Sequence, residues 1–126
     1  DRDPKGVSIK TPSEALKSLA DFLSQWEKLT PTGKNVAGFD LPFLDQLCED
    51  NPELGGNCFY REFLSHRCLD AGSVFFDPSK DENKLPNLQK CLDRADLGTE
   101  VKHTAVEDAK DVLRLLRYKY YGIKEQ

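Results

Sequence analysis

A helix is predicted most clearly by the stretch His103-Thr-Ala-Val-Glu-Asp108-Ala-Lys-Asp-Val-Leu-Arg-Leu-Leu116. Apolar residues recur along it at the spacing of one buried helix face: Ala105, Ala109, Val112 and Leu116. Thr104 followed by Glu107 is the pattern of a capping box, which predicts that the helix starts directly after Thr104. His103 therefore lies just before the helix, and Asp108 lies at the border of its buried face.

The position of Asp108 has two interpretations. A carboxylate at the edge of an apolar face loses hydration, which must be offset by a cation, a metal ion or good hydrogen bonds. On that interpretation the His103 imidazole and the Asp108 carboxylate face one pocket. The alternative is an ordinary solvated helix start, because the helix dipole favours Asp and Glu in the first turn.

The composition is that of a small globular domain. The 126 residues suit one core, and 38% hydrophobic with 32% charged residues is typical of a soluble, folded chain. No apolar run approaches the roughly 20 residues of a membrane span, and the polar N-terminus shows no signal peptide. We therefore expect a cytoplasmic protein with no membrane partner. The net charge of −4 excludes a broad basic field, so any nucleic-acid role would depend on metal ions or local Lys and Arg clusters.

The four cysteines show no zinc-binding pattern. No C-x-x-C pair occurs among Cys48, Cys58, Cys68 and Cys91. Cys48 and Cys91 fall at helical apolar positions, which predicts small buried hydrophobes rather than a disulfide framework.

The remaining pattern predicts an α/β chain. A capping box with Pro at the first helical position opens a helix at Thr11, whose buried face comprises Leu16, Leu19, Ala20, Leu23 and Trp26. Turn residues 30–33 end it, residues 35–39 suit a buried strand, and Leu41-Pro42 starts the next helix. After a loop at 49–57 we expect a short helix within 58–66, a second strand at 67–70 or 73–76, and a helix marked by Leu85, Leu88, Cys91 and Leu92.

Asp40 is the first residue after the predicted strand. Ligands of open α/β sheets bind at the carboxyl ends of strands, although Asp40 would equally suit an N-cap of the next helix. If Asp40 and Asp108 converge, they can hold Mg²⁺ or Mn²⁺, and His103 can accept a proton from water. Carboxylates and a histidine of this kind catalyse two-metal hydrolysis of phosphodiesters, but two carboxylates are too few to hold two ions. Further acidic ligands would be needed.

Two segments resemble motifs of a known family. Asn35-Val-Ala-Gly-Phe-Asp40-Leu-Pro-Phe-Leu resembles the second motif of the DnaQ-like 3′–5′ exonucleases of the DEDDh type, and His103-Thr-Ala-Val-Glu-Asp108-Ala resembles the third. The motifs stand in the family's order at a plausible separation, and the helix from Pro12 matches the one that usually precedes motif two. The resemblance covers most of the chain.

The resemblance implies a ribonuclease-H-like fold, a mixed sheet with flanking helices. It further implies removal of nucleotides from the 3′ end of single-stranded DNA or RNA with two Mg²⁺ or Mn²⁺ ions. By the same resemblance, Asp108 would ligate one ion directly, Asp40 would help hold the second, and His103 would be the general base. Asn35 and Phe39 would shape the site or contact the substrate.

The sequence departs from the family at its start. The first motif, D-x-E at the end of an opening strand, is absent, and Asp1-Arg2-Asp3 lacks the apolar strand before it. The family's first strands should precede the Pro12 helix, and the chain contains no methionine. We therefore expect residues 1–126 to be a single exonuclease-like domain that is the C-terminal portion of a larger one, inactive alone. Lys34 stands where many members have histidine.

Two other interpretations remain open. The chain can be a non-catalytic relative that binds nucleic acid or protein without motif one, or a small acidic helical interaction domain in which the motifs are accidental. A D-x-E upstream of Asp1 would distinguish the active domain from the non-catalytic one.

Overall fold

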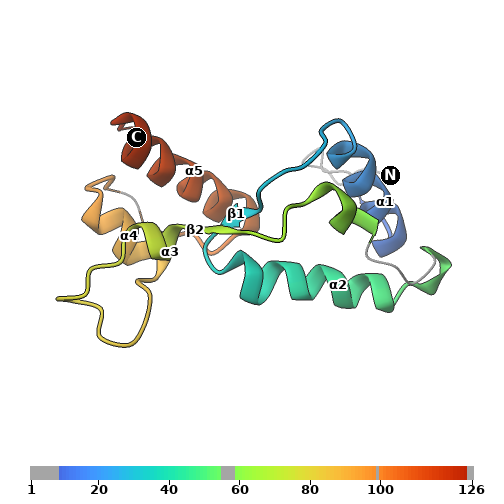
Figure 1. Cartoon of the computed structure of the whole chain (residues 1–126), viewed down its shortest axis with the longest axis horizontal. Coiled ribbons are helices and arrows are strands. Elements are labelled where there is room, and N and C mark those ends of the chain that lie inside the picture. Colours follow the sequence, from blue (N-terminus) through green and yellow to red (C-terminus); the bar gives the residue numbers. More distant parts are fainter. Residues whose placement is uncertain (1–8, 55–58, 99, 125–126) are drawn as a thin grey trace. The chain divides into compact units, whose positions relative to one another are not determined.

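The computed structural model describes residues 9–54, 59–98 and 100–124, and the chain divides into two compact units (Figure 1). The first unit comprises residues up to Pro31 together with Ala37–Arg67, and the second comprises Thr32–Val36 and the chain from Cys68. The chain is mixed α/β, with mostly helical structure and a small parallel sheet of two strands in its described residues. Cys58 and the segment Asp1-Arg2-Asp3 lie outside the described residues.

Helix α1, Pro12–Leu23, opens the first unit as predicted. The Thr11 hydroxyl accepts a hydrogen bond from the Glu14 N–H, and the Glu14 carboxylate accepts one from the Thr11 N–H, so the capping box is complete. Leu16, Ala20 and Leu23 are buried. The prediction that Trp26 continues this face is wrong, because the helix ends at Leu23. Trp26 is 45% exposed and meets the Phe22 ring edge to face.

Helix α2, Leu41–Glu49, is held to the 3-10 helix η3, Phe59–Phe63, by a partly buried network of hydrogen bonds. The hydroxyl of the fully buried Tyr60 lies 2.6 Å from an Asp45 carboxylate oxygen and 3.2 Å from the Leu41 carbonyl. Arg61 donates to both oxygens of the same carboxylate. The short helix predicted after the loop is thus confirmed, as 3-10 helix. A second 3-10 turn, η2 (Pro52–Leu54), precedes it.

The second unit is built on two short parallel strands, β1 (Thr32–Gly33) and β2 (Leu69–Asp70), with Thr32 opposite Leu69. Helices α3 (Ala71–Val74), α4 (Leu88–Arg94) and α5 (Ala105–Tyr121) follow, and α3 and α4 both pack against α5. Their core comprises Ala71, Leu88, Cys91, Leu92, Ala95, Leu97, Val101, Val112 and Leu115. Cys48 and Cys91 are both buried free thiols, as predicted.

The strand predicted at Asn35–Phe39 is wrong. The strand is Thr32–Gly33, inside the predicted turn, and Val36–Asp40 forms the π-helical turn η1 that leads into α2. The physical reason lies at Asn35, whose backbone is left-handed with φ 60° and whose N–H donates to Asp70. The chain therefore leaves the strand before its apolar run begins. The predicted second strand is confirmed as β2, whereas Ser73 and Val74 belong to α3.

Candidate metal and nucleic-acid site

The start of α5 places His103 and Asp108. The helix begins at Ala105 with Thr104 in the N-cap position, as predicted, but the Thr104 side chain makes no capping hydrogen bond. The predicted capping box is therefore wrong, and Glu107 instead lies 3.7 Å from the Lys110 ammonium. His103 is exposed and has a left-handed backbone, φ 59°, which directs the chain into the helix.

The buried face of α5 is rotated from the predicted one. Ala105 and Ala109 are exposed, whereas Asp111, Val112 and Leu115 are buried and Leu116 is half-buried. Asp111 tolerates this position because the Arg114 guanidinium lies 3.0 Å from its carboxylate and also donates to the Leu97 carbonyl. The spacing of apolar residues could not predict which face of α5 is buried, because that face includes the ion pair between Asp111 and Arg114.

Asp108 lies on the same side of α5 as Asp111 but has no comparable partner. Its Oδ1 atom is buried and has no hydrogen-bond donor among the described residues. A buried acceptor without a donor costs free energy, and a cation or an added donor would remove that cost. Asp108 is therefore not part of a fully solvated helix start, whereas a pocket shared with His103 stays a prediction.

Asp40 stands at the N-cap position of α2 without acting as a cap. Its backbone is helical, with φ −64° and ψ −46°, and its side chain makes no capping hydrogen bond. The residue is exposed, and partial desolvation by the surrounding chain raises the pKa of its carboxyl. The alternative that Asp40 serves only to cap α2 is therefore wrong. Asp40 belongs to the first unit, whereas His103 and Asp108 belong to the second, and their convergence stays a prediction.

Asn35 and Phe39 have different surroundings. The Asn35 N–H donates to an Asp70 carboxylate oxygen at 2.8 Å, which ties the end of β1 to the end of β2. The other Asp70 oxygen accepts from the Gly72 N–H at 2.7 Å and caps α3. Phe39 is 66% exposed and available to contact a ligand. A substrate role for either residue stays a prediction.

Asp70 is the residue that the sequence reasoning missed. Its position before Ala-Gly, directly after a short apolar run, is an N-cap signal that could have marked it. Gly72 is needed beside it, because a Cβ there would lie 3.0 Å from Asp70 Oδ1 and 3.0 Å from Lys34 Cε.

The donor set suits a hard divalent ion only in part. Carboxylate oxygens are the ligands that Mg²⁺ and Mn²⁺ prefer. Asp108 offers an Oδ1 atom with no hydrogen-bond donor among the described residues, and the Asp40 side chain makes no capping bond to α2. Across residues 9–54, 59–98 and 100–124, no group of three His, Cys, Asp or Glu side chains forms a metal site by itself. In that same part of the chain, no helix is long and apolar enough to cross a membrane.

We compared the chain with protein families, curated proteins and solved structures. No family model, curated protein or solved structure matches this chain.

Proposed function

We propose that this chain belongs to a metal-dependent 3′–5′ exonuclease domain of the DnaQ-like DEDDh type with a ribonuclease-H-like fold. Its substrate is the 3′ end of single-stranded DNA or RNA. The observation that carries the proposal is the buried Asp108 Oδ1, which has no donor among the described residues and stands where motif three requires a metal ligand. The uncapped Asp40 carboxylate in motif two supports it.

Each residue has a role in this proposal. Asp108 and Asp40 hold Mg²⁺ or Mn²⁺, and such ions, when bound, lower the pKa of water and offset charge at the scissile phosphate. His103, exposed at the start of α5, accepts the proton of the attacking water. Phe39, exposed on η1, contacts the terminal nucleotide, and Asn35 shapes the site through its backbone bond to Asp70.

A non-catalytic domain that binds nucleic acid or protein is the second candidate. The sequence contains no D-x-E motif at a strand end, and the two carboxylates named above do not complete a two-ion site. Binding of single-stranded nucleic acid without hydrolysis would select this candidate.

The metal site can be tested with Mn²⁺, which broadens the NMR signals of nearby nuclei. We expect titration of the 15N-labelled chain to broaden the amide signals around Asp108 selectively and saturably. The signals around Asp40 should broaden at the same Mn²⁺ concentration, and excess Mg²⁺ should reverse both effects. Asp108→Asn should abolish the effect, and Asp40→Asn should weaken it.

Glu107→Gln is the matched control, because it removes a neighbouring carboxylate of the same helical turn that has a partner in Lys110. Its titration should resemble that of the unchanged chain. Broadening that survives Asp108→Asn would refute the metal site. Broadening near Asp108 that leaves the Asp40 signals sharp would refute the shared site.

The role of His103 is tested by turnover of a 5′-labelled single strand by the complete gene product. The products should shorten from the 3′ end, and His103→Ala should lower turnover by about 10² to 10⁴, the usual contribution of a general base. His66, the other histidine, is exposed and provides the control, since His66→Ala should leave turnover unchanged. Full activity of His103→Ala would remove the general-base assignment.

A further inference from the structure

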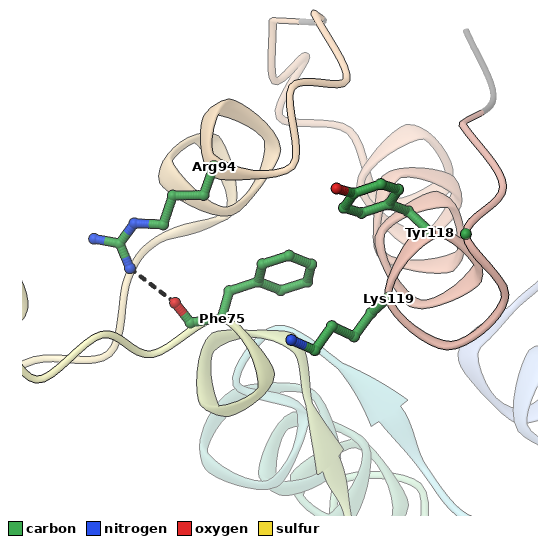
Figure 2. Close-up of a pocket in the computed structure, with 5 residues that line it drawn as sticks. Phe75, Arg94, Tyr118 and Lys119 are labelled. Atoms are coloured by element: carbon green, nitrogen blue, oxygen red, sulfur yellow. Dashed lines mark hydrogen bonds between the residues drawn. The ribbon is translucent and has the colours of Figure 1, made fainter.

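A pocket of about 470 Å³ lies in the second unit, at the opposite end of α5 from Asp108 (Figure 2). Its lining comes from the C-terminal ends of α3, α4 and α5 and comprises Phe75, Arg94, Tyr118, Lys119 and Gly122. The volume falls within the roughly 300 to 1,000 Å³ of small-molecule sites. Tyr118 lies ten positions after Asp108 in the helix, about 15 Å along the axis, so the pocket is distinct from the candidate metal site.

Two half-buried aromatic rings line the pocket. Phe75 follows α3 and Tyr118 lies in the last turns of α5, and both pack against the core of the second unit. Figure 2 shows the Phe75 ring directed toward the space beside Tyr118 and Lys119. Because the core holds both side chains, their rings form a preformed surface on which a flat ring can stack.

The two cationic side chains of the pocket, Arg94 and Lys119, differ in their interaction partners. The Arg94 guanidinium is taken up by both oxygens of Asp81 and by the Phe75 carbonyl. Lys119 is exposed, its ammonium lies 5.9 Å from the centre of the Phe75 ring, and no carboxylate in the described part of the chain pairs with it. Lys119 is therefore the group that can meet an anion at the mouth of the pocket.

We infer that this pocket binds a nucleotide, with the base against Phe75 and Tyr118 and the phosphate on Lys119. A planar ring joined to an anion matches these two features together. The choice of a nucleotide among aromatic anions rests on the proposed nuclease function. The nucleotide can be a free monophosphate or one residue of a single strand, which share the base and the phosphate.

The test is a titration of the 15N-labelled chain with adenosine monophosphate in excess EDTA, so that no divalent ion takes part. We expect saturable shifts of the amide signals of Phe75, Tyr118, Lys119 and Gly122. Adenosine and inorganic phosphate should each bind more weakly, because each supplies one half of the ligand. A short oligothymidylate is the second arm: tighter binding than the monophosphate identifies a strand as the source, and weaker binding identifies the free nucleotide.

Two variants separate the two halves of the site. Lys119→Gln should weaken binding of the monophosphate about tenfold, since a charge-assisted contact is lost, and leave adenosine binding unchanged. Phe75→Leu keeps apolar packing and should weaken both ligands about tenfold, since base stacking is lost. Lys110→Gln, an exposed lysine elsewhere on α5, is the charge control.

The result that overturns the inference is an absence of saturable shifts at these amides, or equal binding by Lys119→Gln, Phe75→Leu and the unchanged chain. Amide spectra and thermal unfolding of each variant show that it is folded. Because EDTA is present, failure here leaves the Mn²⁺ result at Asp108 unaffected, and failure of that result leaves this one unaffected.

Discussion

Arg94 and Asp81 form a two-pronged ion pair, with guanidinium-to-carboxylate distances of 2.6 and 2.7 Å. The pair links the end of α4 to the loop that precedes it, and Asp81 is buried there. The Asp77 N–H donates to the same carboxylate at 2.9 Å. The hydrogen bonds from Arg94, followed by that from Asp77, lower the pKa of Asp81 to about 2.

This lowered pKa predicts a stability loss in acid. The folded state holds Asp81 ionised more strongly than the unfolded state does, so the contribution is complete above about pH 4 and disappears as the pH falls toward 2. Asp81→Asn should lower the free energy of unfolding at pH 7, and its difference from the unchanged chain should shrink between pH 4 and 2. Urea unfolding at pH 7, 4 and 2.5 measures both effects.

Glu82→Gln is the control for acid unfolding, because Glu82 is the exposed neighbour of Asp81. It should follow the unchanged chain at each pH. A difference between Asp81→Asn and the unchanged chain that stays constant through this pH range would contradict the assigned pKa.

The buried Tyr60 hydroxyl predicts a loss of stability in alkali, in contrast to the loss in acid at Asp81. Burial, followed by the hydrogen bond to Asp45, raises the pKa of Tyr60 above its ordinary value near 10. Because the folded state keeps this proton, its contribution is complete below pH 10 and is lost as the pH rises further. Tyr60→Phe should cost about 1 kcal/mol at pH 7 through the lost hydrogen bond and should flatten the alkaline decline.

The measurement for Tyr60 is urea unfolding from pH 7 to 11. Tyr121→Phe is the matched control, since Tyr121 is 77% exposed and its hydroxyl can bond to water in both states. Equal alkaline slopes for Tyr60→Phe and the unchanged chain would show that Tyr60 does not carry the raised pKa.

Gly72 is predicted to be intolerant of a side chain. An added Cβ would lie 3.0 Å from Asp70 Oδ1 and 3.1 Å from Leu85 Cβ, and Asp70 cannot move without losing its bonds to Asn35 and Gly72. Gly72→Ala should therefore lower the free energy of unfolding by about 1 to 3 kcal/mol, the usual cost of overpacking. Ser73→Ala, an exposed position in the same helix, should change it little. Thermal unfolding of both variants measures this difference, and equal stability of the two variants would contradict the prediction.

The Asp108 carboxylate is predicted to lower the free energy of unfolding when no metal ion is bound. In the absence of divalent ions, Asp108→Ala removes the buried acceptor without a donor and should raise the free energy of unfolding by about 1 kcal/mol. Glu107→Ala loses a first-turn carboxylate without this relief, so it should be neutral or slightly destabilising. Urea unfolding in EDTA compares them. A stability loss at Asp108 larger than at Glu107 would show that the carboxylate is satisfied in the folded state.

Local chemistry made much of the chain predictable. The capping box and proline at Thr11-Pro12 predicted the start of α1, and the helix start after Thr104 was predicted from its sequence pattern. Apolar patterning predicted β2 and the burial of Cys48 and Cys91, but it placed the first strand at residues 35–39 and not at Thr32–Gly33. These features depend on residues within one or two turns of each other, which a sequence displays directly.

Long-range partners decided what the sequence could not display. The apolar run after Asn35 is not a strand, because Asp70 captures the Asn35 N–H from 35 residues away. The buried face of α5 includes Asp111, because the Arg114 guanidinium neutralises its carboxylate, whereas Asp108 Oδ1 meets no donor in the described chain. Sequence by itself thus determined where α1 and α5 begin and which carboxylates deserved testing. Only the tertiary structure decided which polar groups are satisfied, since a hydrogen bond depends on atoms that folding brings together.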